Sequence, residues 1–204
     1  MLKTAAILAV VAVGALLGGS ILAMTVFRPD TDLAACGQGA VGGDIGGPFT
    51  LVDETGATVT DADVITGPTL IYFGYTFCPD VCPLDNMRNA QAVEILEERG
   101  LMVTPVFITI DPERDTVERV ADFTDNFHDR MLGLTGTPEQ VRAASQAYRT
   151  FYQKQDTDDE FYLVDHSVQT YFVTPEDGFV DFFGRSESPE EMADRVQCLL
   201  EAAG

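Results

Sequence analysis

The chain has 204 residues and a formal net charge of −21 at pH 7, from 12 basic and 33 acidic side chains. This balance argues against nucleic acid as a partner, because phosphate backbones bind basic surfaces. Hydrophobic residues make up 46% of the chain, and the length suffices for one domain with a sizeable core.

The first 28 residues have the composition of a membrane anchor. Residues 5–27 carry no charge and, as a helix about 34 Å long, would cross the hydrocarbon core of a bilayer. Lys3 and the α-amino group favour an N-terminus in the cytoplasm, which would place the remaining chain outside. A cleaved signal peptide is the alternative, although the apolar run is long for one and no small-x-small site follows it directly.

Residues 29–45 are predicted to be a flexible linker, because six glycines fall between Gly37 and Gly47. A domain over residues 46–204 follows. Within the linker, residues 33–36 resemble a bacterial lipobox, but a polar stretch separates them from the apolar run. The even number of cysteines favours a disulfide between Cys36 and Cys198, which would pin the linker to the end of the domain. Free thiols and lipidation of Cys36 are the alternatives.

Strands and helices alternate along the domain. The pattern predicts a hairpin over 49–60, buried strands over 69–73 and 102–110, a strand over 131–134, an exposed loop over 153–160, and strands over 168–173 and 179–183. Helices are expected over 83–100, 115–127, 137–152 and 188–202. The first of these is predicted to bury one apolar face, made of Leu84, Met87, Ala90, Val93 and Leu96.

Three capping patterns mark helix starts. Thr137 with Gln140 and Ser188 with Glu191 are capping boxes, and Asp115 with Glu118 resembles one. The order of elements predicts an α/β domain with a mixed central sheet and helices on both faces. A terminal hairpin followed by a helix is typical of a thioredoxin-like fold.

The most informative stretch is the turn between the strand over 69–73 and the next helix, where Cys78 and Cys82 are three residues apart. Backbone N–H groups and a helix N-terminus favour a thiolate at such a turn, and the thiolate is both the nucleophile and the metal-binding form of cysteine. The pair could therefore bind a metal or exchange disulfides. A purely structural disulfide is the alternative.

A single histidine is expected to join this pair. Thioredoxins hold a cis-proline at the turn before the penultimate strand, whereas this chain has no proline between Pro138 and Pro175 and places His166 there. We therefore predict a surface-exposed, three-ligand metal site made of Cys78, Cys82 and His166. Two thiolates and one imidazole suit copper, Cu(I) above all, whereas structural zinc normally has a fourth ligand.

Three further polar residues were weighed for roles at the site. Asp165 is a candidate to orient the imidazole from the second coordination shell, and Asp80 a candidate to tune the charge of the site or to contact a partner. Neighbours in sequence often point apart, and the favoured interpretation of Asp80 is a solvated turn residue. The other histidine, His128, is interpreted as structural.

Three separate stretches, 73–83, 111–116 and 164–167, together resemble the Sco/SenC family of copper proteins. The resemblance covers about residues 46–200. It implies a thioredoxin-like domain that is tethered to a membrane and binds copper through Cys78, Cys82 and His166. The copper is expected as Cu(I), and Cu(II) is the alternative. The resemblance also implies a role in building the binuclear copper centre of cytochrome c oxidase.

Two functions follow from this resemblance. The first is a copper chaperone that delivers copper to the copper-receiving subunit of the oxidase, with another periplasmic copper chaperone as a second candidate partner. The second is a membrane-anchored thiol–disulfide reductase that uses Cys78 and Cys82 as a redox pair on the cysteines of the oxidase copper site or of other exported proteins. Either would belong to a single-pass protein of the bacterial inner membrane with its domain in the periplasm.

Overall fold

The computed structural model describes residue 36, residues 45–156 and residues 162–203. The predicted anchor over residues 1–28 and nearly all of the predicted linker over 29–45 lie outside the described residues. Within the described part of the chain, no helix is long and apolar enough to cross a membrane.

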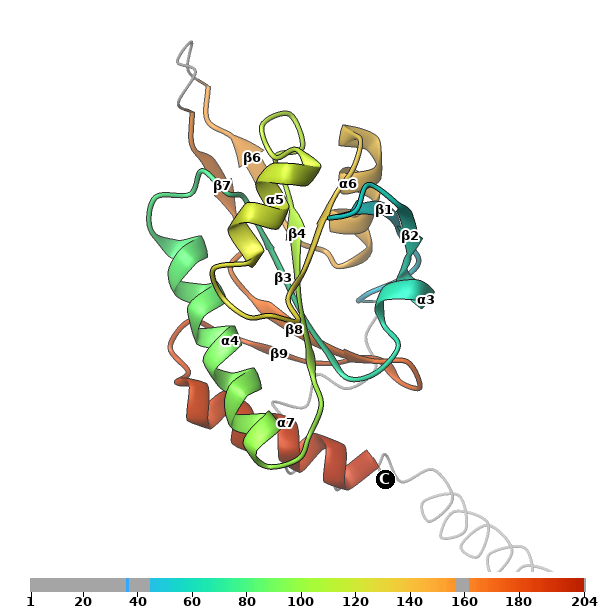
Figure 1. Ribbon diagram of the computed structural model, residues 1–204, viewed down its shortest axis with the longest axis vertical. Helices are drawn as coiled ribbons and strands as arrows, with labels where there is room; N and C mark the ends of the chain where they lie inside the picture. The colour runs from blue at the N-terminus through green and yellow to red at the C-terminus, as the bar shows by residue number, and fades with distance from the viewer. Residues whose placement is uncertain (1–35, 37–44, 157–161, 204) are drawn as a thin grey trace, which may run out of the picture.

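A seven-stranded sheet forms the centre of the domain, in the strand order β2-β1-β5-β4-β3-β8-β9 (Figure 1). The three middle strands run parallel, and the strands on both sides of them are antiparallel, so the predicted mixed sheet and N-terminal hairpin are confirmed. The strands are β1 (Thr50–Asp53), β2 (Thr58–Thr60), β3 (Thr69–Gly74), β4 (Thr104–Thr109), β5 (Leu132–Thr135), β8 (Thr170–Thr174) and β9 (Gly178–Phe183).

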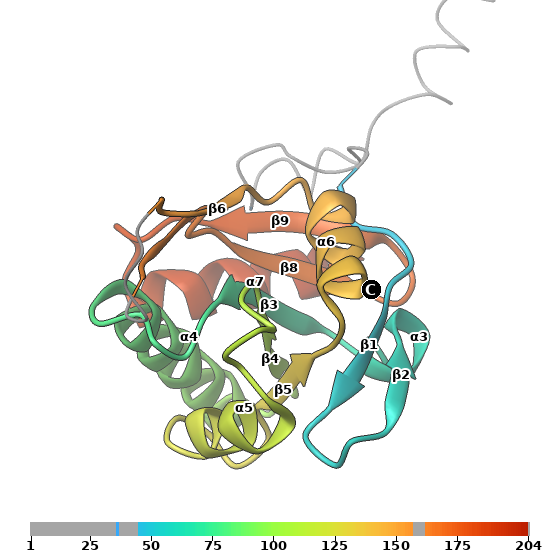
Figure 2. The same ribbon diagram turned by 90° about the horizontal axis from the view of Figure 1, so that it is seen from above.

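Helices cover both faces of this sheet, as the sequence predicted (Figure 2). They are α3 (Asp61–Val64), α4 (Val81–Glu98), α5 (Val117–Thr124), α6 (Pro138–Ala147) and α7 (Pro189–Ala203). The pleat of β3 shows how the faces are assigned, because successive side chains point to opposite sides. Tyr72 donates a hydrogen bond to Asp85 of α4, while the ring of Phe73 packs 5.4 Å from that of Tyr148, which ends α6. The architecture is thioredoxin-like.

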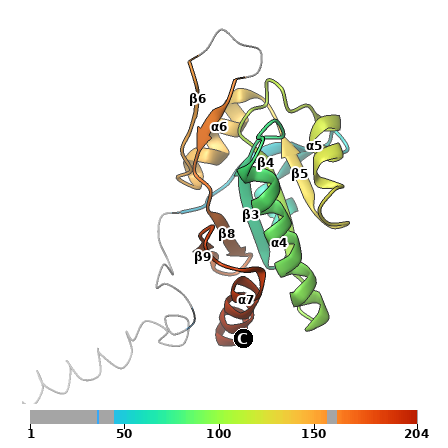
Figure 3. The same cartoon turned by 90° about the vertical axis from the view of Figure 1, so that its left-hand side faces the viewer.

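A separate hairpin differs from the sequence prediction. Helix α6 ends at Ala147. A two-stranded sheet follows, made of β6 (Tyr152–Lys154) and β7 (Val164–His166), where the sequence predicted a helix end, a loop and a turn. The backbone of Arg149 takes the left-handed conformation, with φ of 51°, which stops the helix from continuing to residue 152. Figures 1 and 3 show this hairpin at the end of the sheet where α4 begins.

The predicted apolar face of α4 is wrong in its first half. Leu84 and Met87 are 58% and 43% exposed, whereas Ala90, Val93 and Leu96 are buried as expected. The helix instead buries four polar side chains near its start, namely Asp85, Asn86, Arg88 and Asn89. Asn86 donates to the Cys82 carbonyl of the same helix, whereas the other three find partners in or next to the sheet, as when Arg88 donates to the carbonyl of Gly184 and to the hydroxyl of Thr170. The spacing of hydrophobic residues cannot predict a helix face that is buried through hydrogen bonds between polar side chains.

The start of α5 also differs from the prediction. Its N-cap is Thr116, whose hydroxyl accepts from the N–H of Arg119. Asp115 does not cap the helix, because its side chain is fully buried and its carboxylate accepts a hydrogen bond from the Thr109 hydroxyl. The capping boxes of Thr137 with Gln140 and of Ser188 with Glu191 are confirmed, and the latter begins α7.

The predicted disulfide is present between Cys36 and Cys198, whose Cα atoms lie 5.6 Å apart across a separation of 162 residues. It fastens residue 36 to α7, where Cys36 packs against the core cluster shared by α4 and α7. In this structure the Cys36 sulfur is therefore occupied by the disulfide and not by a lipid.

Replacing Cys36 with alanine is expected to lower the free energy of unfolding by about 2–5 kcal/mol, because the unfolded chain loses a cross-link that closes a long loop. Thermal unfolding without reductant measures the effect as a lower Tm. Adding reductant should lower the Tm of the wild type to that of the variant and should leave the variant unchanged. Equal Tm values in oxidised wild type and variant would contradict the prediction.

Candidate metal centre

The two cysteines sit where β3 passes into α4. The helix begins at Val81, two residues earlier than predicted, so Cys82 lies in its first turn and Cys78 in the loop before it. The N–H of Cys82 donates to the Cys78 sulfur at 3.3 Å. Gly74 ends β3 directly beneath the pair, where a Cβ would come within 3.0 Å of the Cys82 sulfur. Only glycine leaves room for that sulfur.

His166 reaches the pair from β7. Its Nε2 lies 3.4 Å from the Cys82 sulfur, and the ligand atoms of Cys78, Cys82 and His166 all lie within 4.8 Å of one another. The structure thus brings together the three residues that the sequence singled out, although they are far apart in the chain. Both cysteines are free thiols, so the purely structural disulfide between them is not formed.

The tautomer of the imidazole follows from its second nitrogen. His166 Nδ1 lies 2.7 Å from the carbonyl oxygen of Ser167, which can only accept a hydrogen bond. Nδ1 therefore carries the proton, and in the neutral ring Nε2 turns its lone pair toward the sulfurs. This is the form in which histidine binds a metal.

The site is less exposed than the sequence suggested. The Cys82 side chain is fully buried, Cys78 is 6% exposed, and His166 is half-buried. The imidazole is therefore the ligand most open to solvent. A molecule that approaches the site would meet it before either sulfur.

The two thiols have opposite acidities. A hydrogen bond from the Cys82 side chain is the largest cause that lowers the pKa of Cys78, to about 3, and the backbone N–H groups of Asp80 and Cys82 add to it against the opposing effect of burial. Burial raises the pKa of Cys82, and the charge on Cys78 raises it further. The pair is therefore a thiolate at Cys78 that accepts from a thiol at Cys82.

Asp165 does not orient the imidazole, and Asp80 is exposed, as expected of the solvated turn residue that the sequence also allowed. Asp165 points away from the imidazole, since neighbours on a strand face opposite sides, and accepts from Gln155 at 2.8 Å. The partner of the imidazole is the Ser167 carbonyl instead. The Asp80 side chain is exposed at the start of α4, and only its backbone N–H reaches Cys78.

His128 has the structural role predicted for it. Its Nδ1 accepts from the backbone N–H of Arg130 at 3.1 Å, and its Nε2 lies 3.3 Å from Glu97, which also pairs with the Arg130 side chain. Both ring nitrogens are thus used in packing α4 against the segment after α5. The two histidines of the chain have clearly different environments.

Comparison with known proteins now places the chain. A model of the family described as SCO1/SenC matches residues 38–201. The chain belongs to the SCO1/SenC family. Among its SCO1/SenC relatives, protein SenC of Rhodobacter capsulatus is 54% identical over 203 residues, covering 98% of this chain and 91% of that protein. The human mitochondrial SCO2 homolog is 44% identical over 191 residues, covering 90% and 71% of the two chains.

Solved structures of other SCO1/SenC proteins have the same fold. The copper-bound crystal structure of ScoI from Arabidopsis thaliana matches with a TM-score of 0.74 and 41% identity, covering 77% of this chain and 98% of that one. Copper-bound yeast Sco1 matches with a TM-score of 0.72 and 34% identity, covering 77% and 88%. BsSco, which is described as a member of a family of cytochrome c oxidase assembly proteins, is 20% identical and shows the shared fold alone.

A buried carboxylate, which sequence reasoning missed, holds the cysteine loop of this SCO1/SenC protein. Asp115 accepts from the backbone N–H of Thr76 at 3.0 Å, from its hydroxyl at 2.6 Å and from the Thr109 hydroxyl at 2.6 Å. Burial raises the pKa of Asp115 against these hydrogen bonds. Because Thr76 precedes Cys78 by only two residues, Asp115 fixes the loop to the end of β4. The available sequence signal was an aspartate shortly after a predicted strand, but an aspartate at that place resembles a helix cap equally well.

A second missed group lies behind Cys82. The Tyr72 hydroxyl donates to Asp85 at 3.0 Å, and the other oxygen of Asp85 pairs with Arg185 at 3.2 Å. Tyr72 is fully buried, with its ring 6.3 Å from that of His166. Burial raises the pKa of Tyr72, and the charge of Asp85 raises it further. The hydroxyl thus stays protonated at the back of the site and gives Asp85 a buried partner.

Proposed function

We propose that this SCO1/SenC protein binds copper through Cys78, Cys82 and His166 and delivers it during the assembly of cytochrome c oxidase. The observation that supports this most directly is the convergence of two sulfurs and one imidazole nitrogen within 4.8 Å. Thiolate sulfur is the ligand that selects Cu(I), which accepts low coordination, and imidazole suits copper in both oxidation states. Structural zinc would require a fourth ligand, and among the described residues no further histidine, cysteine or carboxylate joins the group.

The ligands differ in a way that suits delivery. Both sulfurs lie at the junction of β3 and α4 and are buried, whereas His166 lies on a separate hairpin and keeps part of its surface exposed. A receiving ligand would therefore enter on the side of the imidazole and displace it before the sulfurs. The Cys78 thiolate would hold the ion until that exchange is complete.

The partners follow from the same proposal. The receiving protein would be the copper-receiving subunit of the oxidase, and another periplasmic copper chaperone is a candidate for the supply of the ion. The first 28 residues would anchor the chain in the bacterial inner membrane, with the domain in the periplasm. The uncharged run over residues 5–27 supports the anchor, and the Cys36–Cys198 disulfide supports an oxidising compartment.

A thiol–disulfide reductase is the second candidate, and the state of the cysteine pair favours it. The Cys78 sulfur is already a thiolate, with its pKa lowered by the Cys82 hydrogen bond, and Cys82 lies close enough to donate a backbone N–H to it. In such a reaction Cys78 would attack a partner disulfide and release one partner thiol. Cys82 would then attack the mixed disulfide, leaving the Cys78–Cys82 disulfide and a second partner thiol.

Copper content of the purified, reduced full-length chain tests the proposal. After loading with Cu(I) and removal of free metal, we expect stoichiometric copper in the wild type. We expect loss of copper when Cys78 or Cys82 is replaced by alanine, and a clearly weaker copper affinity when His166 is. His128→Ala is the matched control, because it removes the other histidine and should leave copper binding intact. Retention of copper by His166→Ala at wild-type affinity would overturn the three-ligand site.

Oxidase assembly in cells separates the two candidates. His166→Ala keeps both cysteines, so a reductase should still support assembly, whereas a copper carrier should not. We therefore expect His166→Ala to lose oxidase assembly while disulfide exchange with a model substrate stays near the wild-type rate. Full assembly in that variant would favour the reductase.

A further inference from the structure

The hairpin of β6 and β7 carries His166, but no strand pairing among the described residues joins it to the seven-stranded sheet, whose strand β3 leads into the cysteine loop. Something else must hold the imidazole over the sulfurs. Side-chain contacts join the two parts, and one side chain, Arg114, from the turn between β4 and α5, contacts both of them. It is largely buried, with 13% of the side chain exposed.

On the hairpin side, Arg114 grips Tyr162. Its guanidinium carbon lies 3.5 Å from the centre of the Tyr162 ring, and Nη1 donates to the Tyr162 carbonyl at 2.9 Å. Asp111 closes the contact, because one oxygen accepts from Arg114 Nε and the other from the Tyr162 hydroxyl at 2.8 Å. Tyr162 comes just before β7, which ends at His166.

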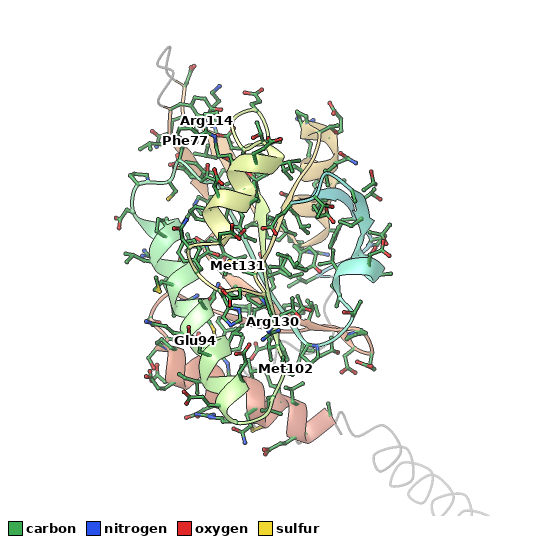
Figure 4. All side chains as sticks on the ribbon, in the orientation of Figure 1. Phe77, Glu94, Met102, Arg114, Arg130 and Met131 are labelled. Atoms are coloured by element: carbon green, nitrogen blue, oxygen red, sulfur yellow. A yellow bond between two sulfur atoms is a disulfide. The ribbon has the colours of Figure 1, made fainter. Side chains whose placement is uncertain are left out.

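On the cysteine side, the same guanidinium faces two aromatic rings of the loop. Its carbon lies 4.7 Å from the centre of Phe77, which directly precedes Cys78, and 5.7 Å from that of Tyr75. Tyr75 itself accepts from the Val164 N–H at 3.3 Å, and its ring packs edge-on 5.7 Å from that of His166. Figure 4 shows Arg114 and Phe77 next to each other at this end of the molecule.

We propose that Arg114 is the positioning residue of the metal centre, which holds the His166 hairpin against the cysteine loop without touching any ligand. The residue must be arginine, because a planar guanidinium can stack on aromatic rings while donating hydrogen bonds from its edge, and a lysine ammonium cannot do both. The inference rests on the proposed copper function for its affinity measurement, but not for its structural one.

Copper affinity in a double-mutant cycle tests how Arg114 acts. Arg114→Gln should weaken Cu(I) binding by about 10- to 100-fold, as expected for a group that orients a ligand. In a His166→Ala background the same change should weaken binding by no more than about twofold, because no imidazole remains to be positioned. Equal losses in both backgrounds would show that Arg114 supports the fold generally and would overturn the proposal.

Arg119→Gln is the matched control. Arg119 also stacks on Phe77, at 4.6 Å, but it is exposed and its ring contact is with the cysteine loop, not with the hairpin. Like Arg114→Gln, the Arg119→Gln substitution removes one positive charge and one contact with the Phe77 ring. We expect copper affinity within about twofold of the wild type. A loss as large as that of Arg114→Gln would assign the effect to charge or to Phe77 and overturn the role of the hairpin.

A copper-free measurement keeps this inference separate from the proposed function. In the reduced apoprotein, nuclear Overhauser contacts between the His166 and Tyr75 rings should be present in the wild type and in Arg119→Gln, and absent in Arg114→Gln. Their persistence in Arg114→Gln overturns the proposal even if the wild type binds no copper. If Arg114→Gln fails to fold, Arg114→Lys, which keeps the charge and the aliphatic stem, should show weakened contacts, and unchanged contacts there would overturn it.

Discussion

At pH 5 the Cys78 side chain of the reduced protein is expected to be almost completely ionised, whereas an ordinary cysteine would be ionised to only about 0.03%. The hydrogen bond from Cys82 is the main cause of the lowered pKa, about 3. The pH titration of thiolate ultraviolet absorbance, with Cys78→Ala subtracted, measures this directly. The absorbance should persist as the pH falls and disappear only near pH 3.

The same titration tests the cause. Cys82→Ala removes the main donor and should raise the pKa of Cys78 toward its ordinary value, while Cys82→Ser, which keeps a hydroxyl donor, should lie between. The stability linked to Cys78 follows the same sign, because its pKa is lower in the folded state than in the unfolded one. That contribution is complete above the unfolded pKa and is lost progressively as the pH falls toward 3. A wild-type transition near pH 8.5 would refute the assigned thiolate.

Asp115→Ala is expected to lower the free energy of unfolding by roughly 3 kcal/mol or more. The change leaves three donors without their acceptor in the core, two on Thr76 and one on Thr109, and each buried unsatisfied donor costs about 1–3 kcal/mol. Urea denaturation of the purified protein measures the loss. Because Thr76 lies in the cysteine loop, a folded fraction of the variant should also bind copper more weakly.

Asp53→Ala provides the control for this measurement. Asp53 likewise accepts three hydrogen bonds, from the N–H and hydroxyl of Thr55 and from the N–H of Ala57, but it does so at the exposed turn of the β1–β2 hairpin. Water can replace these bonds, so we expect a loss of about 1 kcal/mol or less. Similar losses in the two variants would mean that the burial of Asp115 has no energetic importance.

Local sequence was sufficient for much of this protein. Alternating strands and helices predicted the mixed sheet covered on both faces, because hydrophobic period and turn residues act over a few positions. The Cys78–Cys82 turn could be recognised for the same reason, since strand, turn and helix are contiguous. His166 was found by elimination: it stands where a thioredoxin would have a proline. The disulfide between Cys36 and Cys198 followed from counting cysteines.

Other features depend on groups that meet only when the chain folds. Leu84 and Met87 are exposed because the first half of α4 packs through polar side chains, and hydropathy carries no record of the partners at Thr170 and Gly184. Asp115 resembled a helix cap because a short acidic side chain suits both a cap and a buried acceptor. Asp165 was paired with His166 on proximity in sequence, but the strand alternates its side chains and turns it away.

The sequence by itself determined which three side chains have the donor atoms for a metal, because the donor atoms of cysteine and histidine are properties of the residue types. Only the tertiary structure decided that they converge, how deeply the sulfurs are buried, and that Arg114, Asp115 and Tyr72 surround them. Those properties arise from contacts between segments far apart in the chain, and such contacts exist only once the sheet and the hairpin are packed together.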